Sequence, residues 1–277
     1  MTFWLIEDHT PGYSVKWRIH KTIYTEQTAY QHLAIIDTVE FGRALVLDGI
    51  IQTTVSDEFI YHEMIAHVPM FTHPNPRQVL IVGGGDGGTA REVLKHPTVE
   101  KVDLVEIDER VVAVCRTYLP ETACAFADAR VNVIIENGLD YVGKQKGKYD
   151  VLIVDSSDPV GPATELFRKE FYDSVFRSLK DDGLFVAQTD SPFFSQKIFQ
   201  RINRDIRSIF PRVNVYLACV PSYISGYWSF TLGSKFYHPL QDYRVNNLIK
   251  TRYYTPELHK ACFVLPRFIQ ELVEGKE

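Results

Sequence analysis

Four carboxylates stand where a parallel sheet would bring them to one edge. Asp86 lies in a glycine loop after the apolar run Val79–Val82, and Glu106 ends the next such run. Asp155 ends a further run, and Asp158 follows it in a loop rich in serine, proline and glycine. Ligands of open α/β sheets bind outside the carboxyl ends of the strands. We therefore expect all four acids to border one cleft, where they would attract cations.

The glycine loop Gly83–Gly88 lies directly between a predicted strand and a predicted helix. Its glycines permit positive φ and let a ligand approach the backbone. Glu106 follows Asp86 by 106 − 86 = 20 residues, the spacing at which an acid accepts hydrogen bonds from ribose hydroxyls. A carboxylate at Asp86 would repel a pyrophosphate and attract a sulfonium. The loop therefore favours an S-adenosyl compound over a dinucleotide, with Asn137 and Gly138 placed to meet an adenine edge.

The other acids indicate a second, cationic ligand. Four acids without His or Cys at ligand spacing could hold a divalent metal or an amine cation. The aromatic residues expected nearby are Tyr61, Tyr223, Tyr227 and Trp228. Aromatic walls with a few acids suit methylene chains that carry ammonium groups better than they suit a hydrated metal. The residues therefore favour an amine over a metal ion as the second ligand.

Short β-type runs fill the first part of the chain. The pair Asp48-Gly49 between two apolar runs predicts a two-residue hairpin. We expect a small antiparallel β-domain over residues 1–55 and a second domain over residues 56–277. Ser56 is expected to cap a helix that carries Ile60 and Met64. The predicted N-terminal strands are Ser14–Tyr24, Gln31–Asp37, Gly42–Leu47 and Ile50–Thr54.

From Gln78 onward, apolar strands alternate with helical stretches. This order predicts an α/β domain with a parallel sheet covered on both faces, and the last two strands are expected to form an antiparallel hairpin at its edge. The predicted strands are Val79–Val82, Val102–Ile107, Val131–Ile135, Val151–Asp155, Leu184–Gln188, Val213–Leu217 and Tyr227–Leu232. The predicted helices are Thr89–Lys95, Glu109–Tyr118, Glu165–Leu179 and Gln196–Ile209.

Composition excludes several classes of protein. The chain has 277 residues with 45% hydrophobic and 23% charged residues, which is typical of a globular protein. The net charge of −5 without a basic run argues against nucleic-acid binding. No apolar run approaches the length of a membrane helix, and the N-terminus lacks a basic signal-peptide region. The four irregularly spaced cysteines are expected to be reduced thiols of a cytoplasmic protein.

Several motifs, in order, resemble those of the polyamine aminopropyltransferase family, and within it the bacterial spermidine synthases. The resemblance covers essentially the whole chain, and several motifs in order are more specific than any one. The segments that carry it are Tyr24–Thr28 with Gln31–Leu33, Leu47–Gly49, Asp57–Met64, Gly83–Gly88 with Arg91-Glu92, Asp155–Pro159 with Gly161–Ala163, Gln188-Thr189 and Pro221–Tyr223.

The resemblance implies a fold, a reaction and an assembly. The fold is a Rossmann-like domain of the class I methyltransferase type behind an N-terminal β-domain. The reaction moves an aminopropyl group from decarboxylated S-adenosylmethionine to putrescine, which gives spermidine and methylthioadenosine. The donor is a co-substrate, and no metal or nicotinamide cofactor is implied. Homodimers or homotetramers are usual in the family, and no nucleic acid or membrane partner is expected.

The resemblance also assigns residues to two ligands. The nucleoside-site positions are Gln31, Glu106, Asn137, Gly138 and Pro162, and Asp86 would face the aminopropyl ammonium of the donor. The amine-site positions are His62, Asp86, Asp155, Ser156, Ser157 and Asp158, with Tyr61, Gln188 and Tyr223 lining the same cavity.

Within this scheme the acids take different tasks. Asp155 is expected to be the general base that frees the attacking amine, with Tyr61 as its hydrogen-bonding partner. Asp158 would hold the distal ammonium. A methionyl carboxylate would be repelled by Asp86, which would favour the decarboxylated donor. Arg91 is expected at a helix surface or a domain contact.

Two departures from the family pattern leave the acceptor open. Asn137 stands where an aspartate is frequent, and Ile224 stands where a proline is frequent beside the acceptor pocket. Agmatine, cadaverine or spermidine are alternative acceptors. A methyltransferase that uses intact S-adenosylmethionine shares the glycine loop and Glu106, and a polyamine-binding protein without turnover would share the acids. A nicotinamide-dependent oxidoreductase is disfavoured by Asp86.

Overall fold

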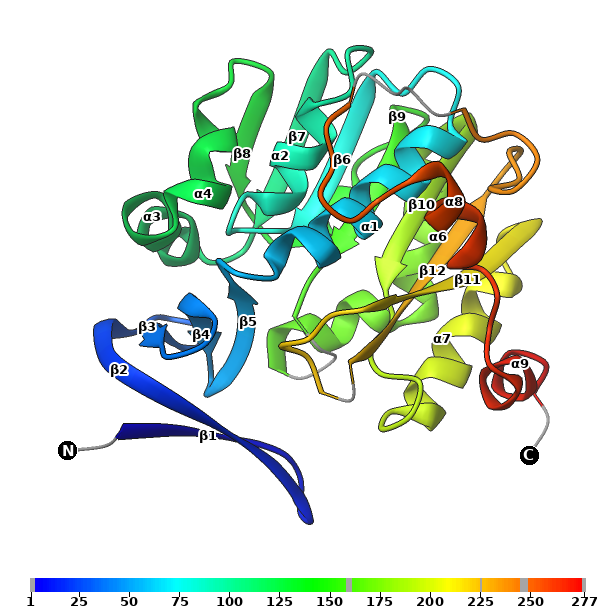
Figure 1. The fold of residues 1–277 in the computed structure, drawn as a ribbon. Helices are drawn as coiled ribbons and strands as arrows, with labels where there is room; N and C mark the ends of the chain where they lie inside the picture. The colour runs from blue at the N-terminus through cyan, green and yellow to red at the C-terminus, as the bar shows by residue number, and fades with distance from the viewer. Residues whose placement is uncertain (1–2, 158–160, 225, 245–248, 276–277) are drawn as a thin grey trace.

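Two β-sheets organise the chain. The computed structural model describes residues 3–157, 161–224, 226–244 and 249–275. The first sheet is antiparallel, with strands in chain order (Figure 1). The hairpin predicted at Asp48-Gly49 is present, and both residues have positive φ, at 48° and 83°, as its turn requires. The strands are β1 (Phe3–Thr10), β2 (Tyr13–Gln27), β3 (His32–Thr38), β4 (Gly42–Leu47) and β5 (Ile50–Thr54).

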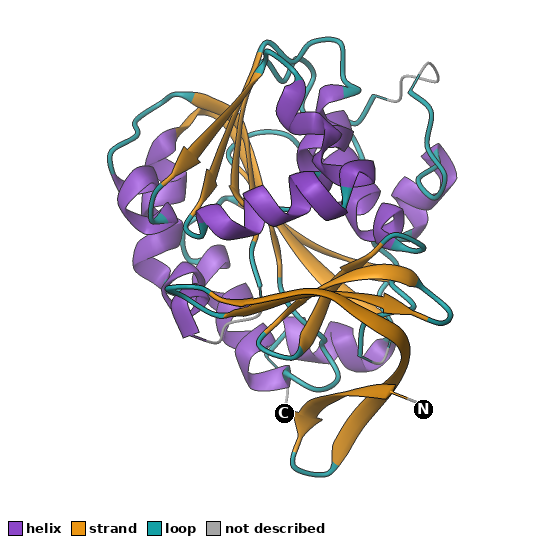
Figure 2. Cartoon of the chain, turned by 90° about the vertical axis from the view of Figure 1, so that its left-hand side faces the viewer, coloured by secondary structure: helices purple, strands orange, loops and turns teal. Residues whose placement is uncertain are grey.

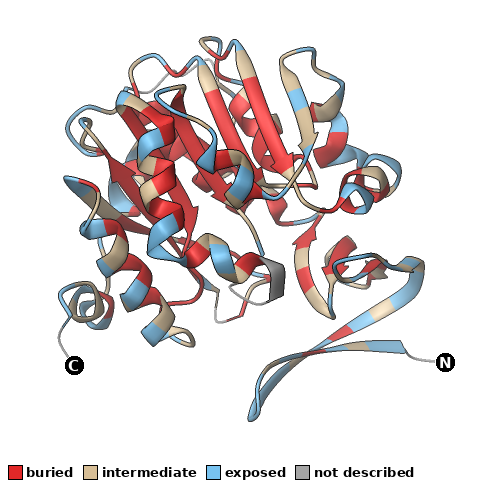
Figure 3. Ribbon diagram, turned by 180° about the vertical axis from the view of Figure 1, so that it is seen from behind, coloured by how far each residue is buried: buried red, intermediate tan, exposed pale blue. Residues whose placement is uncertain are grey.

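Strand β1 was not predicted, and β2 is longer than expected. Together they form a two-stranded ribbon that extends away from the rest of the molecule and is largely exposed (Figure 3). Large apolar side chains of β1 face solvent: Phe3, Trp4 and Ile6 are 50%, 53% and 52% exposed. Leu5, Glu7 and His9 lie on the more buried face of β1, and Glu7 is the buried residue of this strand. Because a charged residue is buried while Trp4 and Ile6 are exposed, the polarity pattern does not indicate this strand.

The second sheet is mixed and forms the centre of the molecule (Figure 2). Its order is β11-β12-β10-β9-β6-β7-β8. The five neighbouring strands β10, β9, β6, β7 and β8 run parallel. Strand β12 pairs antiparallel with both β10 and β11, so the predicted antiparallel hairpin of the last two strands is present at the edge of the sheet. The strands are β6 (Gln78–Gly83), β7 (Lys101–Glu106), β8 (Val131–Ile135), β9 (Tyr149–Asp155), β10 (Leu179–Gln188), β11 (Arg212–Cys219) and β12 (Tyr227–Ser234).

Helices cover both faces of this sheet. In β6, Val79 and Ile81 pack in one core cluster and Leu80 and Val82 in another, because successive side chains of a strand point to opposite faces. No helix among the described residues is long and apolar enough to cross a membrane. The α-helices are α1 (Glu58–Thr72), α2 (Gly88–Leu94), α3 (Glu109–Tyr118), α4 (Pro120–Ala123), α5 (Gly138–Gly143), α6 (Lys169–Ser178), α7 (Gln196–Arg207), α8 (Pro256–Ala261) and α9 (Arg267–Val273), with 3-10 helices η1 (Cys124–Ala127) and η2 (Gly161–Phe167).

Two predicted helix positions were wrong. Helix α1 begins at Glu58 with Asp57, not Ser56, at its N-cap. The Asp57 side chain does not cap the helix and instead accepts hydrogen bonds from the Thr54 hydroxyl at 2.6 Å and the Ser222 amide at 2.8 Å. The stretch predicted as one helix over Glu165–Leu179 is η2 followed by α6, separated by an extended residue at 168. Buried aromatic residues recur at helical spacing on both sides of this break, so the pattern does not reveal it.

We expect that Phe230→Ala lowers the free energy of unfolding by about 3–5 kcal/mol, the usual cost of emptying a buried phenylalanine site. Phe230 is fully buried in β12 and stacks on Tyr216 with 5.0 Å between ring centroids. Urea unfolding at fixed protomer concentration measures this. The control is Phe236→Ala, whose side chain is 60% exposed and should change stability by about 0.5 kcal/mol or less. Equal effects of the two variants would contradict the packing described above.

Candidate active site

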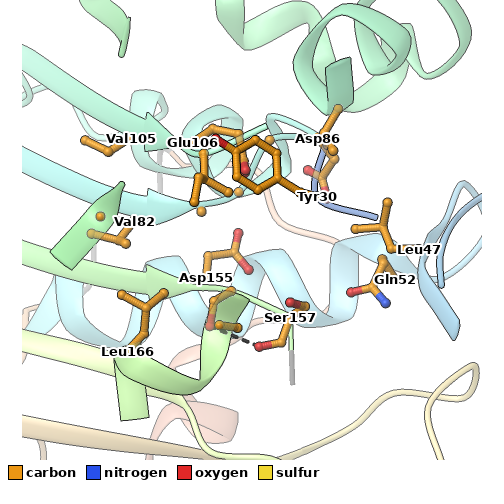
Figure 4. Close-up of a pocket in the computed structure, with 18 of the residues that line it drawn as sticks. Tyr30, Leu47, Gln52, Val82, Asp86, Val105, Glu106, Asp155, Ser157 and Leu166 are labelled. Carbon is orange, nitrogen blue, oxygen red and sulfur yellow. Dashed lines mark hydrogen bonds between the residues drawn. The ribbon is translucent and has the colours of Figure 1, made fainter. Parts of the chain in front are cut away.

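One pocket lies at the carboxyl ends of the central strands, as the positions of the acids predict. It encloses about 1060 Å³ including its open mouth, enough for a nucleoside with a side chain. Figure 4 shows Asp86, Glu106 and Asp155 around this space, from three neighbouring strand ends. The N-terminal sheet closes the other side with Gln31 and Gln52. Residues from both sheets therefore form one cavity.

The glycine loop is shaped around Asp155. Gly83 and Gly84 have positive φ, at 84° and 68°, and the Gly84 amide donates to the Asp155 carbonyl at 2.7 Å. A Cβ atom at Gly83 would lie 2.1 Å from that carbonyl oxygen, and one at Gly84 would lie 2.9 Å from Asp155 Oδ2. Glycine is therefore required at both positions by backbone conformation and by close approach.

Asp155 is held by two hydroxyl donors. The Tyr61 hydroxyl donates to Oδ1 at 2.8 Å, and the Thr89 hydroxyl donates to Oδ2 at 2.7 Å. Burial and the nearby charge of Asp86 raise the pKa of Asp155, against the opposite effects of His62 and the two hydroxyls. A carboxylate with a raised pKa in a pocket is suited to accept a proton. Thr89 was missed at the sequence level, although its place just after the glycine loop points it toward the same edge.

His62 joins the site through ion pairs on both sides of its ring. Its Nδ1 lies 2.6 Å from Glu58 Oε2, and its Nε2 lies 3.4 Å from Asp86 Oδ2. Burial by itself lowers the pKa of His62, but Asp86 and Glu58 outweigh it and raise the pKa well above its usual range. Asp86 also accepts from the Gly88 amide at 2.6 Å, and although burial would raise its pKa, His62 brings it below the usual value. Tyr61 and His62 both line the pocket despite being neighbours on α1.

Four of the five predicted nucleoside positions, Gln31, Glu106, Asn137 and Gly138, line this pocket. Burial, opposed by two backbone amides, raises the pKa of Glu106 to about 7. The side-chain oxygen of Asn137 accepts from the Leu139 amide at 2.8 Å and so caps helix α5. The remaining lone pair and the amide group of Asn137 are left to face a ligand.

A smaller compartment adjoins the pocket and shares Tyr61, Ser156, Ser157 and Tyr223 with it. Gln188 also lines it, and its amide group donates to the carbonyls of Ser156 and Ser157 at 3.1 and 3.3 Å. Gln188 therefore ties the loop after β9 to the end of β10. The Tyr223 hydroxyl donates to the Gln52 carbonyl at 2.7 Å. Asp158 and the side chain of Pro162 lie outside the described residues.

Glu7 is a further carboxylate of this compartment that the sequence analysis missed. It reaches the compartment from β1, is 3% exposed and accepts from Trp17 Nε1 at 2.6 Å. Burial, opposed by hydrogen bonds from Trp17 and the Ile51 amide, raises the pKa of Glu7 to about 7. No motif marks Glu7, because it lies in the one N-terminal strand that was not predicted.

Outside the pocket, one cluster among the described residues has ligand atoms within 4.8 Å of one another: His73, Asp150 and Asp182. It lies at the amino ends of the strands, because Asp150 is at the start of β9. Asp150 already accepts from Lys180 Nζ at 2.7 Å and from the Gln78 amide at 2.7 Å. His73 Nδ1 accepts from the Asn75 amide at 3.2 Å, which leaves the ring proton on Nε2. Asp150 is thus paired with Lys180, and the protonated Nε2 of His73 lies 3.7 Å from Asp182 Oδ2, so His73 offers no free imidazole lone pair for a metal.

Comparison with known proteins identifies relatives over the whole chain. The spermine/spermidine synthase domain family matches residues 58–242, and the spermidine synthase tetramerisation domain family matches residues 3–55. A polyamine aminopropyltransferase of Moorella thermoacetica is 55% identical over 275 residues, which cover 99% of this chain and 97% of that protein. The corresponding protein of Bacillus subtilis is 49% identical over 273 residues, 98% of this chain and 99% of that protein.

Solved structures agree with these matches. A spermidine synthase in complex with the transition-state analogue AdoDATO superposes with a TM-score of 0.96 at 44% identity, over 98% of this chain and 95% of that one. The spermidine synthase of Thermotoga maritima superposes with a TM-score of 0.95 at 43% identity, over 98% of this chain and 94% of that one. The expected Rossmann-like fold with a small N-terminal β-sheet is thereby confirmed.

We expect nucleoside binding to weaken as the pH falls through about 7, the pKa of Glu106. Ribose hydroxyls donate to an ionised carboxylate, so a proton on Glu106 competes with the ligand. The dissociation constant of methylthioadenosine should then rise by up to about tenfold for each pH unit below that pKa. Calorimetric titration between pH 5.5 and 8.5 measures this. Glu106→Gln should bind methylthioadenosine weakly, with a dissociation constant that does not change with pH over this range. An equal pH dependence of the dissociation constant in the variant and the wild type would refute the role of Glu106.

Proposed function

The chain belongs to the spermine/spermidine synthase family, and on that premise we propose that it transfers the aminopropyl group of decarboxylated S-adenosylmethionine to putrescine. The products are spermidine and methylthioadenosine. The observation that carries the proposal is the pocket itself, in which Asp86 and Asp155 lie beside a nucleoside-sized cavity and an aromatic wall. Fixed negative charge of this kind collects two cationic substrates and serves no obvious structural purpose.

The donor occupies the main pocket, which four of the predicted nucleoside residues line. Glu106 accepts from the ribose hydroxyls, while Asn137, Gly138 and Pro162 border the adenine and Gln31 closes the site from the N-terminal sheet. Asp86 then faces the ammonium at the end of the aminopropyl group. A methionyl carboxylate in the same place would be repelled by Asp86, which gives the preference for the decarboxylated donor.

The acceptor amine reaches Asp155 through the adjoining compartment. Its ammonium gives a proton to the Asp155 carboxylate, whose orientation is fixed by Tyr61 and Thr89. The freed lone pair attacks the carbon next to the sulfonium, a C–N bond forms, and the C–S electron pair passes to sulfur. Methylthioadenosine leaves as a neutral thioether, and the new secondary amine keeps the positive charge. Holding the nitrogen in line with the breaking bond supplies the remaining rate enhancement.

The other end of the acceptor lies among the residues of the smaller compartment. Ser156, Ser157 and Tyr223 line its walls, and His62 supports Asp86 at the junction with the donor. Gln188 holds the loop that carries the two serines. Glu7 and the proposed anchor Asp158 supply negative charge for the distal ammonium. Putrescine, with two ammonium groups separated by a short methylene chain, matches this arrangement.

We propose in addition a homotetrameric assembly and a cytoplasmic location. The match of residues 3–55 to a tetramerisation domain and the exposed apolar residues of β1 support the assembly, since such surfaces mark protein contacts. All four cysteines are free thiols, as is usual in a reducing compartment. The sulfonium of the donor provides the leaving group, so the reaction requires no further cofactor.

Purified protein incubated with decarboxylated S-adenosylmethionine and putrescine should produce methylthioadenosine and spermidine in equal amounts. Asp155→Asn should lower kcat by at least about 10²-fold, because the amide cannot take the proton, and should leave the dissociation constant of methylthioadenosine within about threefold of wild type. Near-normal turnover of the variant would exclude Asp155 as the base. The proposed reaction would be contradicted by formation of S-adenosylhomocysteine from the intact donor, or by binding of amines without turnover. Agmatine, cadaverine and spermidine are tested as alternative acceptors in the same assay.

Asp86→Asn should weaken discrimination against intact S-adenosylmethionine. Removing the carboxylate removes its repulsion for the methionyl carboxylate, worth about 1–4 kcal/mol at this range. The ratio of the inhibition constant of the intact donor to the KM of the decarboxylated donor should therefore fall by about tenfold or more. The control is Asp103→Asn, an acid of β7 that is 1% exposed and bonded to Lys148 and Tyr149 away from the pocket. An unchanged ratio in Asp86→Asn would refute the repulsion argument.

A further inference from the structure

A row of alternating charges leads from helix α2 to the pocket. Arg91 donates from both terminal nitrogens to Glu58, at 3.0 and 2.8 Å. Glu58 Oε2 also lies 2.6 Å from His62 Nδ1, and His62 Nε2 lies 3.4 Å from Asp86 Oδ2. The four side chains are thus linked in the order cation, anion, imidazole, anion. Their sequence positions did not predict this, and Arg91, expected at a surface or domain contact, is only 20% exposed in its side chain.

The row is held rigidly from several sides. Glu58 and His62 are one turn apart on α1, so their side chains lie on the same helix face. The His62 ring lies flush against the glycine loop, because a Cβ at Gly88 would be 2.2 Å from its Cε1 atom. On the other side Tyr61 contacts the ring edge, with 5.5 Å between centroids. Glu58 and His62 are 6% and 2% exposed, so little water competes for either group.

The charge state of the row follows from its partners. The titratable groups that face His62 are Glu58 on its own helix, Asp86 and Arg91 from the glycine loop and α2, Tyr61 beside it, and Asp155 from β9. A neutral His62 with its proton on Nδ1 would turn a lone pair toward Asp86, whereas an imidazolium donates to both carboxylates. An ionised Glu58 favours the imidazolium, and the bidentate contact from Arg91 keeps Glu58 ionised and oriented.

We propose that Glu58 and Arg91 are positioning residues that keep His62 as an imidazolium, and that this cation fixes Asp86 as an ionised carboxylate toward the donor. This inference rests on the proposed function. It gives the two acids of the pocket different roles. Asp86 keeps a constant negative charge, and Asp155 is the group that gains and loses the proton. The charge of Asp86 already raises the pKa of Asp155, and without the cation at His62 the two acids would repel each other and titrate as a coupled pair.

The first experiment reads the charge state of His62 in the unmodified enzyme without substrate. Protein labelled with ¹⁵N-histidine is titrated by NMR, and the His62 signals are assigned by their absence in His62→Gln. We expect both ring nitrogens of His62 to stay protonated up to pH 9, which is well above the usual pKa of histidine. A neutral His62 at pH 8 would overturn the proposal. This measurement does not depend on which substrates the enzyme uses.

The second experiment removes the charge of Glu58 and keeps its shape. In Glu58→Gln we expect the pKa of His62 to decrease to a value between 6 and 9. The kcat/KM for decarboxylated S-adenosylmethionine should be at least about tenfold lower than wild type at pH 8.5, and the difference should shrink as the pH falls through the new His62 pKa. The control is Asp103→Asn, which changes a buried acid outside the row. The ratio of its kcat/KM to that of the wild type should not change with pH. A folded Glu58→Gln enzyme with an unchanged profile, or with a loss of activity that is the same at every pH, would overturn the proposal.

The third experiment tests Arg91, which also contacts Glu92 and the Glu121 carbonyl. Arg91→Lys retains the positive charge but not the bidentate contact, and Arg91→Gln retains neither. The shift in the His62 pKa should therefore be smaller in Arg91→Lys than in Arg91→Gln, in the same order as the loss of kcat/KM at pH 8.5. Equal effects of the two substitutions would overturn a charge-based role for Arg91. Absence of aminopropyl transfer by the wild type would instead refute the proposed function and leave the His62 titration valid.

Discussion

Like charges held close together in a pocket are the constraint on which the rest of this structure depends. Asp86 and Asp155 line the same cavity, and both lie where burial disfavours the ionised form. Such a pair is costly unless each charge is compensated. The structure compensates them differently. Asp86 faces His62 and a backbone amide, whereas the hydrogen bonds that the Asp155 carboxylate accepts within the described part of the chain come from two neutral hydroxyls. This asymmetry is what makes one acid a fixed charge and leaves the other free to exchange a proton.

The local backbone is adapted to that arrangement. The glycine loop approaches so closely that side chains at Gly83, Gly84 or Gly88 would collide with Asp155 or His62. The loop therefore does more than make room for a nucleoside, because it also packs directly against the groups that carry the charge. Sites of this kind usually lower the free energy of unfolding, since the charges and conformations that favour function are unfavourable for folding.

The N-terminal sheet completes the cavity. Gln31 and Gln52 line the main pocket, and Glu7 lines the smaller compartment, although all three lie far from the central sheet in sequence. Helix α3 packs against the same sheet through Val111, whose cluster includes Leu33. The two sheets therefore share a core as well as a pocket, and the position of the smaller sheet sets how much of the site is open.

Patterns along the chain were enough to predict the alternation of strands and helices, the Asp48-Gly49 turn and the edge of the sheet at which the acids lie. These features depend on local periodicity and on the rule that parallel strands end at one edge, and both can be read along the chain. The partners of the charged side chains, by contrast, are set by how the folded chain brings distant segments together. Glu58 and Arg91 lie in segments that carry the family resemblance, but neither their spacing nor that of Thr89 and Glu7 shows what they contact. Their roles arise from contacts between segments that are distant in the sequence. The sign and strength of an electrostatic effect depend on distance and burial, and a sequence specifies neither until the chain has folded.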